Sequence, residues 1–172
     1  MKILKVLGKG YAGKVYLTFV KDDPSQMAAI QIFYLFRHAD RRRKNFCTEV
    51  ATMQQSDHST LAQCYTAVKC QDYLVYSMPF YDHGDLIQLE NENGKPFDTK
   101  IITNSILHVA IAVEYLHKHY LAHNDIKPEN EFVDNWGYVH MGDVVFVRQM
   151  NAETRTVRAR DLRGTSTTHT TE

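Results

Sequence analysis

The residues best suited to catalysis lie in one short run, residues 123–130, which reads HNDIKPEN. This run holds a carboxylate, an ammonium and an amide at Asp125, Lys127 and Asn130, and a further carboxylate, Asp143, follows thirteen residues after Asn130. Phosphoryl transfer needs such a set, with one carboxylate at the attacking hydroxyl and an Asn and an Asp that hold magnesium against the phosphates. The simpler interpretation, a polar loop that ends a helix, predicts neither K-P-E-N nor the later Asp.

A glycine-rich run, GKGYAG at residues 8–13, is the second candidate. The pattern G-x-G-x-x-G is a weak signal alone, because a plain hairpin turn also uses glycine for its positive φ. A dinucleotide-binding fold requires a helix directly after the last glycine. Here KVYL follows at residues 14–17 and is typical of a strand, so we reject that interpretation. Two strands around this turn, with Val15 two residues past the third glycine, resemble the loop of protein kinases that covers the ATP phosphates.

The run 123–130 is similar to the protein-kinase catalytic loop, H-R-D-L-K-P-E-N, at six of eight positions. Residues 84–86 resemble the family's G-D-L beyond its hinge, and residues 164–165 with Glu172 keep its spacing from G-T to the Glu of A-P-E. The resemblance to the protein kinase superfamily therefore covers the whole chain. Lys127, two residues past the catalytic Asp, is typical of the serine/threonine branch.

The resemblance implies an ATP and Mg²⁺ site between two lobes. Its catalytic residues would be Asp125, Lys127 and Asn130, and its magnesium ligands Asn130 and Asp143. The nucleotide contacts would come from the glycine-rich turn, the strand and helix that normally carry a Lys–Glu pair, the hinge and the adenine floor. These positions are Gly8, Gly10, Gly13, Val15, Ala29, Gln31, Glu49, Met78, Phe80, Asp85 and Phe132.

The most consequential departure from the family is Gln31, which ends AAIQ where the family has V-A-I-K. In the family that lysine bridges the nucleotide phosphates to a helix Glu, here expected at Glu49. A neutral amide cannot form the ion pair, and removing one preorganised charge-stabilising group typically costs a factor of roughly 10²–10³ in rate. Lys9 and Lys14 are poor substitutes, because strand alternation turns Lys14 away from the face of Val15.

Three further departures affect the loops. Residues 143–145 read DVV in place of D-F-G, which puts a stiff β-branched residue where the backbone normally pivots, so we expect hindered switching between loop states. Asn124 replaces the arginine that clamps an activation-loop phosphate in many kinases, and an amide supplies no such charge. Phe132 stands where the family has an aliphatic residue beneath the adenine ring. This aromatic side chain puts the size of the adenine pocket in doubt.

The elements that must position these residues form an α+β pattern, with strands first and helices later. We expect a kinase-like two-lobe fold with a β-rich N-lobe over residues 1–78, a hinge over 79–84 and a helical, partial C-lobe over 85–172 that is truncated after the activation segment. Asp98 is a good N-cap for a long helix to about Tyr120. The other expected elements are strands over 3–7, 15–20, 27–33, 61–68 and 73–78, a helix over 40–53, turns at 22–25 and 136–137, and a loop over 91–96.

The expected long helix carries apolar residues on nearly all sides, and in the family it packs against helices that follow the A-P-E position. The sequence given stops at Glu172. Three explanations stay open: the sequence is a fragment, a partner protein covers the incomplete C-lobe, or the domain is marginally stable.

Composition narrows the function classes. Lys plus Arg and Asp plus Glu number 20 each in 172 residues, which argues against a nucleic-acid-binding surface. No run approaches the ~20 apolar residues of a membrane span, and three cysteines without close spacing favour a reducing compartment. We therefore expect an intracellular chain, cytoplasmic rather than nuclear, with ATP as ligand and neither nucleic acid nor membrane as partner.

Three hypotheses follow in order of preference. The first is a pseudokinase that binds ATP and acts as a scaffold or regulator. The second is a serine/threonine kinase of low activity, because Asp125, Asn130 and Asp143 are all retained. The third is a truncated remnant without an independent fold.

Overall fold

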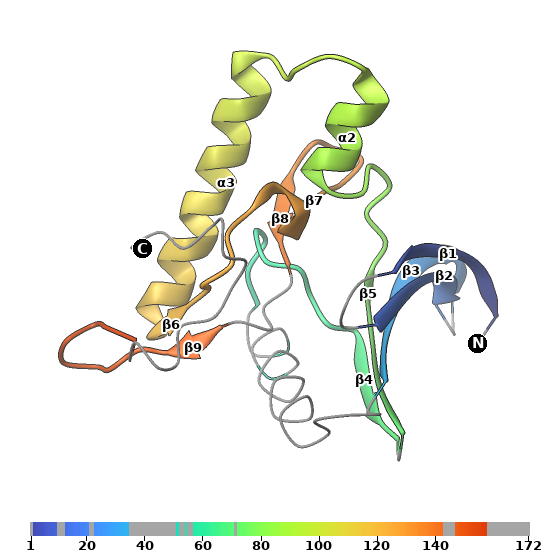
Figure 1. Ribbon diagram of the computed structural model, residues 1–172, viewed down its shortest axis with the longest axis horizontal. Coiled ribbons are helices and arrows are strands. Elements are labelled where there is room, and N and C mark those ends of the chain that lie inside the picture. The colour runs from blue at the N-terminus through green and yellow to red at the C-terminus, as the bar shows by residue number, and fades with distance from the viewer. Residues whose placement is uncertain are drawn as a thin grey trace. The chain divides into compact units, whose positions relative to one another are not determined.

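The contacts of the chain divide it into two units, one rich in strands and one that contains the helices α2 and α3 (Figure 1). The first unit comprises Met1–Ser56 and Gln63–Phe80, and the second Asp57–Ala62 and Tyr81–Glu172. The α+β class predicted from the sequence is confirmed. The computed structural model describes residues 2–9, 13–20, 23–34, 51, 54, 57–70, 72–142 and 147–157.

The first unit is built on a five-stranded antiparallel sheet with the order β1-β2-β3-β5-β4. Four of the five predicted strands are confirmed with longer bounds, because β-branched and aromatic residues favour a half-buried pleated surface. The strands are β1 (Ile3–Lys9), β2 (Gly13–Val20), β3 (Asp23–Tyr34), β4 (Thr66–Lys69) and β5 (Tyr73–Pro79).

Two strand predictions need correction. The turn predicted over 22–25 is wrong in part, because β3 begins at Asp23, which pairs with Val20 across a register shift. The strand predicted over 61–68 is shorter, because Leu61 forms only an isolated bridge to Met141 in the second unit and β4 begins at Thr66. The helix predicted over 40–53 lies outside the described residues, apart from Ala51.

Helix α2 (Leu86–Asn93) was not predicted from the sequence. Asp85 caps its first turn, since the Asp85 carboxylate accepts a hydrogen bond from Gln88 N and Gln88 Oε1 accepts one from Asp85 N. The helix ends at Gly94, whose φ of 63° lies in the left-handed region that favours glycine. The predicted loop over 91–96 is therefore wrong over its first three residues, 91–93.

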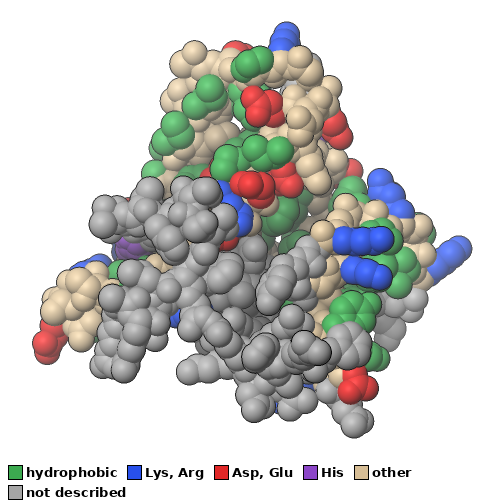
Figure 2. Space-filling model, in the orientation of Figure 1, with side chains coloured by type: hydrophobic (Ala, Val, Ile, Leu, Met, Phe, Trp, Pro, Cys, Tyr) green, Lys and Arg blue, Asp and Glu red, His purple; other side chains and the backbone are tan. Residues whose placement is uncertain are grey.

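Helix α3 (Thr99–Lys118) confirms the predicted long helix and its N-cap, because Asp98 Oδ1 accepts a hydrogen bond from Ile101 N at 2.9 Å. Ala112 and Leu116 are fully buried and pack with Leu61 and Met141. Other apolar side chains of the α3 surface are exposed, and Figure 2 shows hydrophobic side chains on the face of the α2–α3 region. The exposed set is Ile101, Ile102, Ile106 and Leu107.

Short strands complete the second unit. Strand β6 (Leu121–Ala122) pairs with β9 (Arg148–Gln149), and β7 (Glu131–Val133) pairs with β8 (Val139–Met141) through the predicted turn at 136–137. A 3-10 turn, η1 (Pro128–Asn130), precedes β7. Among the described residues, no helix has the length and apolar character needed to cross a membrane.

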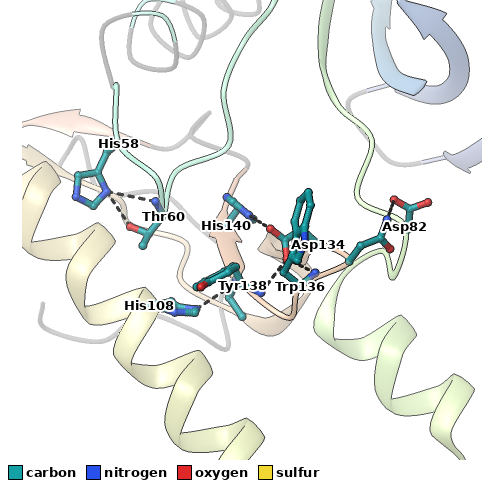
Figure 3. Close-up of polar contacts among 10 residues, drawn as sticks. His58, Thr60, Asp82, His108, Asp134, Trp136, Tyr138 and His140 are labelled. Atoms are coloured by element: carbon teal, nitrogen blue, oxygen red, sulfur yellow. Dashed lines mark hydrogen bonds and ion pairs between the residues drawn. The ribbon is translucent and has the colours of Figure 1, made fainter. Parts of the chain in front are cut away.

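A histidine joins α3 to the β7–β8 hairpin. His108 Nδ1 accepts a hydrogen bond from Val139 N at 3.0 Å, and the His108 ring lies 5.4 Å from that of Tyr138 (Figure 3). Burial lowers the pKa of His108, the nearby His140 lowers it further, and Asp134 opposes them. At neutral pH the ring therefore stays neutral and keeps the lone pair that Val139 requires.

We predict that acid weakens this junction. Because the folded-state pKa of His108 is lowered, its contribution to stability is complete above the ordinary histidine pKa near 6.5 and is lost as pH falls below it. Replacing His108 by Gln keeps an acceptor without the titration. Between pH 7.5 and 5, the wild type should lose about 1 kcal/mol more unfolding free energy than His108→Gln in urea denaturation.

The matched control is His119→Gln, which changes an exposed histidine at the end of the same helix. It should retain the pH dependence of the wild type. Equal pH dependence in the wild type and His108→Gln would contradict the prediction.

Candidate functional site

The catalytic-loop residues predicted from the sequence lie together in the second unit, between β6 and β7. Asp125 is fully buried, and its Oδ2 lies 2.9 Å from Lys127 Nζ. Asn130 Nδ2 donates to the same oxygen at 3.0 Å and to the Asp125 carbonyl at 2.8 Å. The buried carboxylate is thus held by a charged partner and an amide, as a buried charge requires.

His123 connects this loop to the segment before Asp143. Its Nδ1 accepts a hydrogen bond from Asp125 N at 3.3 Å, so the ring proton sits on Nε2, which donates to the carbonyl of Gly142 at 3.1 Å. Gly142 N in turn donates to the Asn130 carbonyl at 2.8 Å. Two hydrogen bonds therefore join the catalytic loop to the residue that precedes the predicted metal ligand.

Asn124, at the position where many kinases have arginine, makes a hydrogen bond within its own turn. Its backbone φ of 64° lies in the left-handed region, which asparagine tolerates better than most residues. Its side-chain amide donates to the carbonyl of Ala122 at 3.1 Å. The side chain thus supports the turn that leads into Asp125.

The donor chemistry of Asn130 fits a magnesium ligand. Its amide nitrogen is occupied by the two hydrogen bonds to Asp125, which leaves the carbonyl oxygen Oδ1 as the coordinating atom. Mg²⁺ takes oxygen ligands and is commonly bound by one or two carboxylates besides water and phosphate. The other predicted ligand, Asp143, lies outside the described residues, as do Val144 and Val145.

The strand residues of the first unit that the sequence predicts to contact nucleotide share one sheet face. Cross-strand pairing places Val15, Gln31 and Tyr76 in one row, and Ala29 and Met78 in the adjacent row of the same face. The structure thus brings four predicted residues, Val15, Ala29, Gln31 and Met78, onto one face of the sheet.

The two candidate replacement lysines lie on the opposite face. Lys14 pairs with Ile32, and Lys9 pairs with Lys14. Because neighbouring residues of a strand point to opposite faces, neither lysine shares the face of Gln31. The sequence-based rejection of Lys14 as a relocated lysine is supported.

Gln31 has a partner that the sequence analysis missed. The hydroxyl of the buried Tyr76 donates to Gln31 Oε1 at 2.7 Å. The strand alternation of Leu74, Tyr76 and Met78 could have signalled that Tyr76 shares this face. Glu49, the predicted ion-pair partner of this position, lies outside the described residues.

The glycines among the remaining nucleotide-binding candidates of the first unit differ in whether a side chain would fit at their positions. A Cβ at Gly13 would overlap the carbonyl oxygen of Ile32, so glycine is required there, whereas a Cβ at Gly8 would meet nothing. Gly10 lies outside the described residues. Phe80 is half-buried just after β5.

Asp85 and Phe132 lie side by side in the second unit, joined by an antiparallel bridge. Burial raises the pKa of Asp85, whereas the hydrogen bonds that its carboxylate accepts as the cap of α2 lower it by less. Phe132 stacks on Tyr81 with the ring centroids 5.4 Å apart and the planes 8° from parallel. The Phe132 ring also covers Gly142, where an added Cβ would overlap it.

Glu131 is a buried carboxyl group that the sequence analysis missed. It is 7% exposed and follows Asn130 directly. Burial, with a smaller contribution from the charge of Glu129, raises its pKa from the ordinary 4.5 to about 7. An acidic residue inside a strand of E-F-V gives no sequence signal for burial, because carboxylates are usually exposed.

Comparison with known proteins matches this geometry to a family. The profile described as "Protein kinase domain" matches residues 1–169. The chain belongs to this family, and the resemblance predicted from its motifs is confirmed. Kinase domains of this family use ATP and Mg²⁺.

Relatives of the chain include proteins named as serine/threonine-protein kinases. It is 26% identical over 151 residues to the mouse serine/threonine-protein kinase Nek3, a match that covers 87% of this chain and 29% of that protein. It is 28% identical over 145 residues to the serine/threonine-protein kinase greatwall of Xenopus laevis, covering 82% and 16% respectively. It is 28% identical over 152 residues to the Drosophila melanogaster cAMP-dependent protein kinase catalytic subunit 2, covering 88% and 43%. The chain thus spans less than half the length of each.

We predict that Glu131→Gln stabilises the fold, and more so at high pH. Because the folded-state pKa of Glu131 is raised, the contribution of this group to stability is complete below pH 4.5 and is lost as pH rises through about 7. At pH 8 the variant should gain about 2 kcal/mol of unfolding free energy, and at pH 5 much less. Urea denaturation at both values measures it.

Glu92→Gln serves as the control at an exposed carboxylate of the same unit. Its effect should be small at both pH values. A Glu131→Gln variant that is equally stable relative to the wild type at pH 5 and pH 8 would refute the raised pKa.

We also predict that Gly142 and Phe132 are energetically coupled. Gly142→Ala should cost about 1–3 kcal/mol of unfolding free energy, because the new methyl group overlaps the Phe132 ring. In the double variant with Phe132→Leu, most of that added cost should disappear. Gly8→Ala, whose Cβ meets nothing, is the matched control. Additive single effects in the double-mutant cycle would argue against the coupling.

Proposed function

We propose that this chain is a serine/threonine-type protein kinase domain that binds ATP with Mg²⁺ but transfers phosphate poorly, so that it acts mainly as a pseudokinase scaffold or regulator. The observation that carries the proposal is Gln31, a neutral amide hydrogen-bonded to Tyr76 where the family has a phosphate-bridging lysine. One missing charge of this kind costs a factor of roughly 10²–10³ in rate.

Retained ligands support nucleotide binding. Asn130 keeps the orientation in which its carbonyl oxygen would contribute to magnesium binding, and Asp143 is retained in the sequence. When bound, Mg²⁺ would neutralise phosphate charge. Binding without the lysine is therefore expected to be weak and dependent on magnesium.

A second candidate is a low-activity kinase that transfers the ATP γ-phosphate to protein serine or threonine. The intact arrangement of Asp125, Lys127 and Asn130 favours it. In this role Asp125 would accept the proton of the substrate hydroxyl, and Lys127 would hold the carboxylate in place.

We predict a small thermal stabilisation by millimolar ATP with Mg²⁺, which is absent without the metal and in Asp143→Ala.

Radiolabel transfer to a generic basic protein should be at least about 100-fold slower than that of an active serine/threonine kinase. Gln31→Lys alone should not restore a normal rate, because residues that act as a unit are not repaired singly.

Asp125→Ala is the control that separates the two candidates. Robust transfer by the wild type that Asp125→Ala abolishes would establish the kinase and exclude the pseudokinase. Folded protein that shows no shift with ATP and Mg²⁺ would exclude nucleotide binding.

A further inference from the structure

Tyr76 is buried directly beside the residue that replaces the lysine. It is 2% exposed and pairs with Gln31 across β3 and β5, forty-five residues apart in the sequence. Its ring stacks with Phe33 at a centroid distance of 5.9 Å. The tyrosine is therefore a rigid donor whose hydroxyl reaches Gln31 at 2.7 Å.

This contact selects one orientation of the Gln31 side chain. A carboxamide has an acceptor end and a donor end, and the two are similar in shape. The Tyr76 hydroxyl donates to the oxygen, so the amide nitrogen is turned away from Tyr76. That nitrogen forms no hydrogen bond to any described residue, and Gln31 lies on the sheet face that carries Val15 and Ala29.

We propose that the Gln31 amide donates to phosphate oxygens of the bound nucleotide as a neutral substitute for the lysine, and that Tyr76 is the positioning residue that keeps its donor end available. The proposal rests on the proposed function as an ATP-binding domain. It deepens that function, because it makes phosphate recognition in the first unit depend on a hydrogen bond rather than on charge.

The physical reason lies in the alternative orientation. Without the Tyr76 hydroxyl, the amide of Gln31 is free to turn and present its oxygen to the phosphates. An oxygen lone pair repels an anion, whereas an N–H donated to a charged acceptor contributes more than a neutral hydrogen bond. Tyr76 thus acts on the nucleotide through Gln31.

The test compares the dissociation constants of ATP with Mg²⁺ and of adenosine by calorimetry. Gln31→Leu should weaken ATP binding about tenfold and leave adenosine binding unchanged, because only the phosphates lose a donor. Tyr76→Phe should weaken ATP binding about threefold to tenfold, again without a change for adenosine. In the Gln31→Leu background, Tyr76→Phe should have no further effect.

Two further variants separate positioning from folding. Gln31→Glu still accepts from Tyr76 but removes the donor and adds a negative charge, so it should weaken ATP binding more than Gln31→Leu does. Tyr73→Phe is the matched control, since Tyr73 lies on the same strand but points to the other sheet face. It should change neither dissociation constant.

The outcomes identify which idea fails. If Gln31→Leu binds both adenosine and ATP with Mg²⁺ as tightly as the wild type does, the nucleotide site exists but the role of Gln31 is overturned. If Gln31→Leu weakens ATP binding but Tyr76→Phe does not, the role of Tyr76 is overturned. A wild type that binds neither ATP with Mg²⁺ nor adenosine would overturn the proposed function, and the present proposal with it.

Discussion

The fully buried carboxylate of Asp125 is the group on which the second unit depends. A buried charge is tolerated only when it is paired and hydrogen-bonded, and here Lys127 and Asn130 meet that need. The constraint extends outward, because Asn130 also accepts from Gly142, whose carbonyl accepts from His123. These hydrogen bonds join the loop and the segment before Asp143 into one network.

The first unit has a neutral side chain, Gln31, at the position where the family resemblance predicts a charged phosphate contact. Gln31 and Tyr76 form a neutral pair where the family uses an ion pair. A neutral pair avoids the desolvation of a lone buried lysine and supports the sheet without a charged partner. The catalytic loop has therefore kept its electrostatics, whereas the strand that would bind phosphate has exchanged charge for hydrogen bonding.

Phe132, the residue predicted to form the adenine floor, shows how one large side chain depends on its neighbours. The Phe132 ring occupies space that a side chain at position 142 would fill, and it stacks on the nearly parallel ring of Tyr81. The buried Glu131 lies in the same hairpin. The sequence raised the question of pocket size from Phe132 alone. It contained no sign that Gly142 makes room for the ring, because Phe132 lies on β7 whereas Gly142 directly follows β8, and the two residues meet only when β7 and β8 pair.

Local patterns in the sequence determined the catalytic loop, the Asp98 cap of α3 and the opposite faces of Lys14 and Val15, because these depend on spacing within one element. Tertiary structure alone decided that Tyr76 orients Gln31 and that Glu131 is buried. It also set the β4 bounds, for which the apolar run of residues 61–68 gave no correct boundary. The reason is physical: strand register and burial arise from pairing between segments far apart in the chain, which local periodicity does not encode.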